Sequence, residues 1–177
     1  MKLQGSCHCQ SVHFEVESHT PYPFMLCYCS ICRKTAGGGG YAINIMGQAE
    51  TLQVEGKKHV QIYHALLSKN KQGKPKHSSG QRHFCKHCAS CLWIFDPSWP
   101  EWIYPFASAI DTPLPKPPER FHILLDYAAK WCEIPKGKRN LHFNEFPEES
   151  IEKWHKRHDY IVNKFFRWVY RNLGVSI

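Results

Sequence analysis

Seven of the nine cysteines in this chain of 177 residues stand in three short groups, and these groups restrict its possible folds more than any other feature. The groups are Cys7-His8-Cys9, Cys27-Tyr28-Cys29-Ser30-Ile31-Cys32 and Cys85-Lys86-His87-Cys88. The cysteine total is odd and the thiols are clumped, which is not the pattern of a disulfide scaffold. Because closely spaced thiolates are frequent ligands of zinc, we expect a zinc protein.

The first and third groups together offer four thiolates, from Cys7, Cys9, Cys85 and Cys88. Four thiolates fill a tetrahedral zinc site and leave no open position, so we expect a structural zinc here. Two cysteines on one face of an ideal strand are too far apart to share a metal, so the chain must turn around His8. The alternative is a redox pair at Cys85 and Cys88, but no thioredoxin-like βαβ pattern surrounds them.

The second group offers three thiolates within six residues, from Cys27, Cys29 and Cys32. Three protein ligands with one position left for water or substrate is the arrangement of a catalytic zinc site. A helix beginning at Ser30, a suitable N-cap, would place Cys29 and Cys32 one turn apart. The alternative, which spacing alone leaves open, is that a histidine or Cys91 completes a second structural site.

The cysteine groups and their neighbours resemble the glutathione-dependent formaldehyde-activating enzyme family, which also includes centromere protein V. The matching segments are Gly5-Ser6-Cys7-His8-Cys9-Gln10, Cys27-Tyr28-Cys29-Ser30-Ile31-Cys32-Arg33-Lys34 and Arg82-His83-Phe84-Cys85-Lys86-His87-Cys88, with weaker matches at residues 108–111, 122–123 and 130–131. The chain departs from the family at Ala89-Ser90-Cys91, where a glycine commonly follows the second cysteine pair.

The resemblance implies an Mss4-like β fold with two zinc ions. The structural zinc would be held by Cys7, Cys9, Cys85 and Cys88, and the catalytic zinc by Cys27, Cys29 and Cys32. It also implies a carbon-sulfur lyase of the S-(hydroxymethyl)glutathione synthase type, which condenses glutathione with formaldehyde.

Alternation of apolar and polar residues independently predicts a mainly β domain. Val12, Phe14 and Val16 alternate with polar residues, and further short strands are predicted at residues 41–46, 51–54, 59–64, 91–95, 103–109 and 121–125. Loops are expected at the glycine run 37–40 and at the lysine-rich stretch 69–81. Four prolines between positions 113 and 118 predict an extended connector.

After Pro147 the pattern becomes that of a long helix, with apolar residues from Ile151 to Val169 and Gly174 near its end. We therefore expect a zinc-binding β domain over residues 1–145 and a C-terminal helical extension over 146–177. The basic residues of this extension are Lys153, Lys156, Arg157, Lys164, Arg167 and Arg171. Packing of the helix on the domain, or on a second subunit in a homodimer, is the preferred interpretation.

Several other side chains could serve these sites. His8, His83, His87 and His122 are candidate bases or ligands, and the two that flank the third cysteine group, His83 and His87, are favoured for supporting roles. The aromatic residues Trp93, Trp99, Trp102 and Phe106 are expected mainly in the core. Cys91 and Cys132 are expected to be buried thiols.

Charge and hydropathy narrow the choice of partners. Lys and Arg outnumber Asp and Glu by 23 to 15, a formal charge of +8, which favours anionic substrates or partners. No apolar stretch is long enough to cross a bilayer, so a cytoplasmic protein without membrane contacts is expected. The lysine-rich stretch carries no RNA-binding or helix-turn-helix signature, so we expect it to be a solvated face and expect no nucleic-acid partner.

Two functions are compatible with these observations. The favoured one is a zinc-dependent enzyme that makes or breaks a carbon-sulfur bond between a glutathione-like thiol and a formaldehyde-like aldehyde. The alternative is a non-enzymatic, zinc-stabilised binding module that contacts protein or nucleic acid through its basic C-terminal helix.

Overall fold

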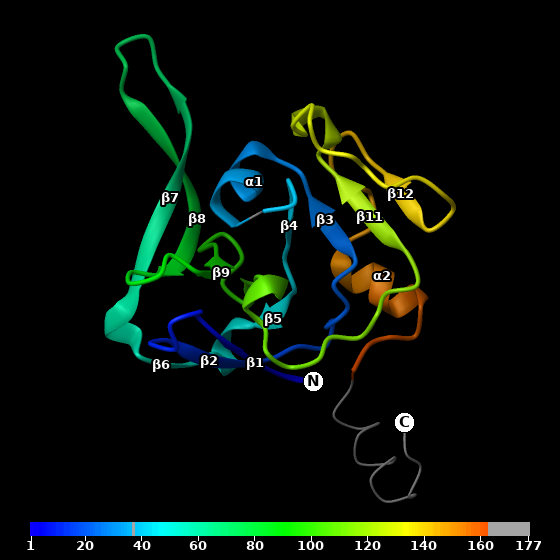
Figure 1. The fold of residues 1–177 in the computed structure, drawn as a ribbon, viewed down its shortest axis with the longest axis horizontal. Helices are drawn as coiled ribbons and strands as arrows, with labels where there is room; N and C mark the ends of the chain where they lie inside the picture. The colour runs from blue at the N-terminus through cyan, green and yellow to red at the C-terminus, as the bar shows by residue number, and fades with distance from the viewer. Residues whose placement is uncertain (37, 163–177) are drawn as a thin grey trace, which may run out of the picture.

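Strands rather than helices make up most of the regular structure in residues 1–36 and 38–162, the part of the chain that this computed structural model describes. Within these residues the strands form three sheets (Figure 1). The predicted mainly β class is therefore confirmed.

The first two sheets are antiparallel and face each other across the core. The first has the order β1 (Lys2–Ser6), β2 (His13–Glu17) and β6 (Gln53–Glu55). The second has the order β5 (Gly47–Gln48), β10 (Trp102–Pro105), β9 (Cys91–Phe95), β8 (Pro75–Cys85) and β7 (Val60–Lys69). Short 3-10 helices lie in their connections: η1 (Ala49–Thr51), η2 (Lys57–His59) and η3 (Ala107–Ala109).

The third sheet is mixed and brings together distant parts of the chain. Its order is β12 (Asn140–His142), β11 (Arg120–Ile123), β3 (Met25–Cys27) and β4 (Ala42–Ile43), and β11 runs parallel to both β3 and β12. The short helix η4 (Leu125–Tyr127) follows β11. The sequence pattern does not predict β3 or β12, because each has three residues and shows too little alternation to be recognised.

The alternating apolar residues of the first sheet form one part of the core. Leu3, Phe14 and Val16 are buried, and the ring of Phe14 meets that of Trp93 edge to face, with centroids 5.2 Å apart. Gly5 lies at a close approach: a Cβ there would come within 2.4 Å of the Ala109 carbonyl oxygen. The first sheet is thereby held against η3 just before the first cysteine pair.

The structure corrects the predicted loop at residues 69–81. Strand β7 continues to Lys69 and β8 begins at Pro75, so only residues 70–74 connect them, and Asn70 Oδ1 accepts hydrogen bonds from the backbone of Gln72 and Lys74 in this turn. Strand β9 pairs with β8 only from Gln81 onward. Residues 66–78 therefore project beyond the sheet as a two-stranded hairpin (Figure 1).

Several other predicted elements are shorter than expected. Of the predicted strand 41–46 only β4 forms, and the predicted strand 121–125 ends at Ile123. The predicted strand 103–109 ends at Pro105, since residues 107–109 form η3. The predicted long C-terminal helix begins as expected but ends at Arg157: α2 covers Ile151–Arg157, and residues 158–162 are not helical. The rest of that prediction, residues 163–177, lies outside the described residues.

Helix α2 packs on the β domain. Trp154 is fully buried and stacks on Phe24, with ring centroids 3.9 Å apart, while its Nε1 donates to Glu119 at 2.9 Å. The described part of the 146–177 extension thus shares the core of the preceding residues, and the division at residue 145 stays a prediction. None of the helices in the described residues has the length and apolar character that a membrane crossing requires.

Candidate metal centres

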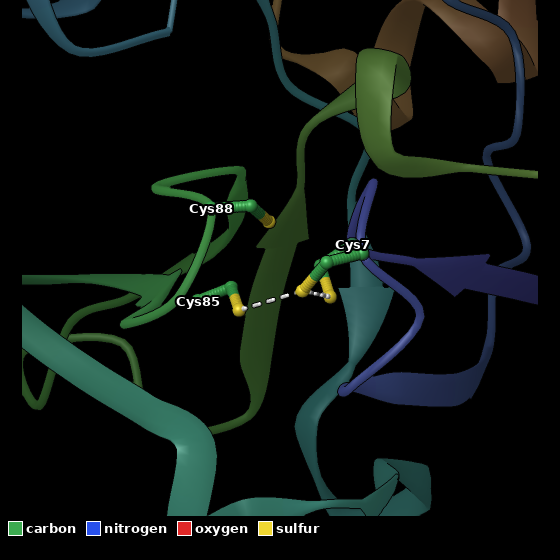
Figure 2. A group of neighbouring side chains, drawn as sticks. Cys7, Cys85 and Cys88 are labelled. Atoms are coloured by element: carbon green, nitrogen blue, oxygen red, sulfur yellow. Dashed lines mark hydrogen bonds between the residues drawn. The ribbon is translucent and has the colours of Figure 1, made fainter.

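Two turns that are distant in the sequence bring Cys7, Cys9, Cys85 and Cys88 together, here termed the first cysteine cluster (Figure 2). The four sulfur atoms lie within 4.8 Å of one another. The Sγ of Cys9 is 3.5 Å from that of Cys7 and 3.7 Å from that of Cys85. Four sulfurs placed tetrahedrally at zinc-sulfur bond length would be separated by about 3.8 Å, so the cluster fits a zinc ion.

Backbone hydrogen bonds form the two turns that aim these thiols inward. The chain turns after Cys7 as predicted, with Gln10 N donating to Cys7 O at 2.9 Å. The second turn is closed by Ala89 N, which donates to Cys85 O at 2.8 Å. Ala89 has φ +59°, in the left-handed region that favours glycine, so this chain keeps the turn with a strained residue.

Burial and local hydrogen bonds act oppositely on the thiols of the first cysteine cluster. Burial raises the pKa of Cys7 to about 11, whereas a hydrogen bond with the Ser90 hydroxyl, 3.2 Å away, lowers the pKa of Cys88 to about 5. A bound cation would stabilise the thiolate form of every member. The cluster therefore has the donor chemistry of a metal site, with Cys7 and Cys85 buried and Cys9 exposed.

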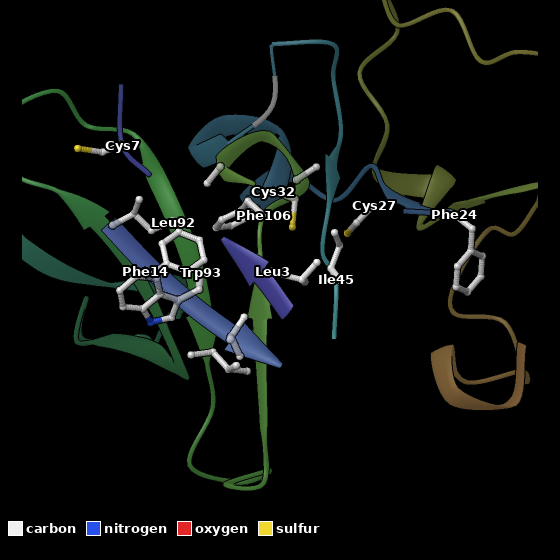
Figure 3. Close-up of a cluster of buried hydrophobic side chains, with 14 of the residues drawn as sticks. Leu3, Cys7, Phe14, Phe24, Cys27, Cys32, Ile45, Leu92, Trp93 and Phe106 are labelled. Atoms are coloured by element: carbon white, nitrogen blue, oxygen red, sulfur yellow. The ribbon is translucent and has the colours of Figure 1, made fainter. Parts of the chain in front are cut away.

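The second cysteine cluster consists of Cys27, Cys29 and Cys32, whose sulfur atoms also lie within 4.8 Å of one another. Cys27 ends β3, and Cys32 lies in α1, which covers Ser30–Ala36. Both are buried among the core side chains (Figure 3), whereas Cys29 is only partly buried. A small molecule would therefore reach this cluster from the side of Cys29.

Cys29 also caps α1, in place of the predicted Ser30. Cys32 N donates to the sulfur of Cys29 at 3.3 Å, and Arg33 N donates to the Cys29 carbonyl at 3.0 Å. Hydrogen bonds from the neighbouring thiols, mainly from Cys27, hold the pKa of Cys29 well below its ordinary value. The same hydrogen bond raises the pKa of Cys27. The cluster thus carries a thiolate that can bind a cation.

No fourth Cys, His, Asp or Glu ligand atom joins the second cysteine cluster within residues 1–36 and 38–162. Cys91, a candidate for that place, instead donates its thiol proton to the Thr35 carbonyl at 2.7 Å. Cys132 lies 3.4 Å from the Gly39 carbonyl. Both are partly exposed rather than buried as expected. The described ligand set is therefore three sulfurs.

A buried hydrogen-bond chain supports the second cysteine cluster. The hydroxyl of Tyr28 lies 2.9 Å from His122 Nδ1, and His122 Nε2 lies 3.0 Å from Asn140 Oδ1. Asn140 Nδ2 donates to the Lys136 carbonyl, which leaves Oδ1 to accept from His122. His122 Nδ1 is then the acceptor for the Tyr28 O–H. Burial lowers the pKa of His122, consistent with a neutral ring.

The other predicted histidines lie elsewhere. His83 stacks on Trp93 with centroids 5.0 Å apart, and His87 Nε2 lies 2.8 Å from His59 Nδ1. His8 donates its backbone N–H to Ser90 Oγ. The sequence favoured His83 and His87 for supporting roles. In the structure it is His122 that contacts Tyr28, the residue between Cys27 and Cys29. The position of His122 between two apolar residues of a strand was the available signal.

The predicted aromatic core is partly present: Trp93 and Phe106 are buried, whereas Trp99 is 60% exposed. Glycines 38 and 39 lie in a turn, and a Cβ on Gly40 would come within 2.6 Å of the Cys132 sulfur. The glycine run therefore includes one position where chain segments meet closely.

The basic face of the C-terminal helix is largely neutralised where it is described. Arg157 forms ion pairs with Glu119 and Glu149, each at 2.8 Å, and Lys156 pairs with Glu152. Lys164, Arg167 and Arg171 lie outside the described residues. Two of the three basic side chains described on this helix thus form ion pairs within the chain.

Comparison with known proteins agrees with this geometry. The sequence model of the glutathione-dependent formaldehyde-activating enzymes matches residues 2–123. The chain belongs to this family. The matched segment of the glutathione-dependent formaldehyde-activating enzyme family contains every member of both cysteine clusters and ends at β11, which carries His122.

The chain is also similar to two individual proteins. A Halomonas elongata protein named as a candidate glutathione-dependent formaldehyde-activating enzyme is 55% identical over 157 residues, which cover 89% of this chain and 96% of that protein. A Rhodobacter sphaeroides protein of known crystal structure is 25% identical, with a TM-score of 0.47, and the match covers 65% of this chain and 92% of the other.

Proposed function

We propose that this protein is a zinc-dependent carbon-sulfur lyase of the S-(hydroxymethyl)glutathione synthase type, acting on a glutathione-like thiol and a formaldehyde-like aldehyde in the cytoplasm. The observation that carries the proposal is the difference between the two clusters: four sulfurs lie together in one and three in the other. A set of three ligands leaves a tetrahedral ion one position for a reactant. Family membership and the name of the Halomonas relative support the substrates.

The residues of the second cysteine cluster would divide the work. A zinc ion held there supplies Lewis acidity and stabilises sulfur in its thiolate form. Cys27 and Cys32, which are buried, would hold the ion from the core side, where water is excluded. Cys29, which is partly exposed, lies on the side from which reactants would enter. Tyr28, fixed by His122, holds the segment between two ligands in place.

The reaction joins the substrate sulfur to the aldehyde carbon. The S–H bond breaks and a C–S bond forms, while the π electrons of the carbonyl become a lone pair on oxygen. The proton lost by sulfur ends on that oxygen, giving a hydroxymethyl thioether. No electrons enter or leave, so no redox partner is needed.

The first cysteine cluster would hold the structural zinc. Its four thiols come from the turn between the strands of the first sheet and from the turn between β8 and β9 of the second sheet. A zinc ion there would link the two sheets and leave no position for a substrate.

The test compares Cys29→Ser with Cys132→Ser, which removes one thiol outside both clusters. We expect two zinc ions per chain in the wild type and in Cys132→Ser, and one in Cys29→Ser, measured by mass spectrometry. Exchange between 13C-formaldehyde and its glutathione adduct, followed by NMR, should be accelerated by the first two proteins only. Full acceleration by Cys29→Ser would overturn the proposed site.

A further inference from the structure

All of the net charge of this protein resides in one continuous stretch. Residues 56–95 contain eight of the 23 Lys and Arg residues and none of the 15 Asp and Glu residues, so the remaining chain has equal numbers of each. This stretch forms η2, β7, β8 and β9. The nearest following acid, Asp96, is engaged by Ser79 Oγ at 2.9 Å and by Ser98 N at 3.0 Å.

The outer half of the β7–β8 hairpin stands free of the other strands. Between Pro75 and Gly80, strand β8 pairs with β7 and does not pair with β9. Residues 66–78 thus form a projecting hairpin, visible at one end of the molecule in Figure 1. Its register shifts beside Leu66 increase the local twist, and His64 and His77 bond across the strands.

The charge is concentrated at the end of this hairpin. Lys69, Lys71, Lys74 and Lys76 are all exposed and lie within eight residues of one another across the turn. They make no ion pair with any acidic residue in the described part of the chain. Four unpaired cations on a two-stranded projection form a surface for a polyanion.

We propose that this hairpin binds duplex DNA through its phosphate backbone. The major groove of B-form DNA admits a two-stranded β-ribbon, and lysines at the ribbon end would then lie near the phosphates on either side. The deep, narrow major groove of duplex RNA does not admit it. This inference is independent of the proposed enzymatic activity. It replaces two expectations from the sequence, that residues 69–81 are a solvated face and that the protein has no nucleic-acid partner.

Membrane insertion fits the hairpin less well. Leu66 and Leu67 are 44% and 52% exposed, but both precede the lysine-bearing end. Entry of the hairpin into a bilayer would bury the charged end before these apolar side chains, at high energetic cost. The order of charge and hydrophobicity therefore favours DNA.

The test measures anisotropy of a fluorescein-labelled 20-base-pair DNA with the metal-loaded, full-length protein. With four phosphate contacts, we expect the affinity to fall about 100-fold between 50 and 200 mM KCl. The variant with Lys69→Gln, Lys71→Gln, Lys74→Gln and Lys76→Gln should lose at least 30-fold in affinity at 50 mM KCl and most of the salt dependence.

A matched variant separates this site from net charge. The matched variant changes four exposed lysines outside the hairpin and has the same net charge as the hairpin variant. Its substitutions are Lys116→Gln, Lys136→Gln, Lys138→Gln and Lys153→Gln. This variant should bind like the wild type. Equal loss in both variants would overturn the proposal, as would equally tight binding of poly-L-glutamate, single-stranded DNA or vesicles containing phosphatidylserine.

Discussion

The hydroxyl of Tyr28 lies 2.9 Å from Nδ1 of His122, although 94 residues separate the two in the sequence. Tyr28 stands between Cys27 and Cys29, and both Tyr28 and His122 are fully buried. The parallel pairing of β3 with β11 creates this contact. The second cysteine cluster is therefore positioned by β11, a strand that lies later in the sequence than every cysteine of the first cluster.

Tyr28→Phe removes the donor and leaves the buried His122 Nδ1 without a partner. We expect the free energy of unfolding to fall by about 1–2 kcal/mol, and the metal affinity of the second cysteine cluster to fall relative to that of the first. Urea unfolding and chelator competition measure the two effects. Tyr41→Phe is the control, because its hydroxyl makes no hydrogen bond to the described residues, and an equal loss in both variants would contradict this role.

Loss of the first cysteine cluster should affect the whole fold. Cys85 is fully buried and Cys29 is not, so Cys85→Ser should lower the free energy of unfolding by more than about 4 kcal/mol, whereas Cys29→Ser should cost much less. The comparison is made by thermal and urea unfolding of zinc-loaded proteins. A larger effect at Cys29 would mean that the structural and reactive assignments are reversed.

Ala89 is a position where a single substitution should stabilise the protein. Its φ of +59° strains a side chain with a Cβ, and glycine relieves this strain. Ala89→Gly should raise the free energy of unfolding by about 0.5–1 kcal/mol, after the entropic cost of glycine in the unfolded chain. Ala107→Gly in η3 is the control and should destabilise the protein.

The spacing of the cysteines within each short group could be predicted to suit a metal because local turns determine it. Cys7 and Cys9 flank a tight turn, and Cys29 and Cys32 lie at the start of a helix, so their spacing already restricts the geometry. The contact of the candidate residue His122 with Tyr28 could not be predicted, since it depends on pairing between distant strands. The projecting hairpin escaped prediction because most of its side chains are exposed, so no apolar period marks its strands.

The early end of α2 likewise follows from tertiary contacts. Tyr160 stacks on Tyr22 with centroids 4.2 Å apart, and Val162 N donates to the His19 carbonyl at 3.0 Å. These contacts turn the chain back onto the domain at Asp159, whose φ is +60°. Within the described residues, the chain beyond Arg157 thus packs on the domain instead of continuing the helix.

Trp154 fixes the C-terminal segment to the domain through its stack on Phe24. Trp154→Ala should therefore cost about 3–5 kcal/mol of folding free energy, because it opens a large cavity and frees Glu119 from a hydrogen bond. Trp131→Ala is the matched control, since Trp131 is 64% exposed, and it should change stability by less than about 0.5 kcal/mol. Similar urea midpoints for the two variants would show that α2 is not anchored in this way.

His155 should make stability depend on pH. Its Nδ1 donates to the Ile151 carbonyl at 2.8 Å and its Nε2 accepts from Tyr22 N at 3.1 Å, a pattern that requires the neutral ring. Burial lowers the pKa of His155 from 6.5 to about 4. Between these two values the unfolded chain binds a proton that the folded chain does not, so acid favours unfolding.

The contribution of the neutral His155 ring is complete above pH 6.5 and is lost as the pH falls toward 4, by about 2–3 kcal/mol. Metal release also destabilises the fold in acid, so the informative quantity is the difference between wild type and His155→Leu in urea unfolding. This variant should be clearly less stable than the wild type at pH 7.5, and the gap should close or reverse at pH 4.5. A gap that stays constant across this range would show that His155 is protonated in the folded protein as readily as in the unfolded chain.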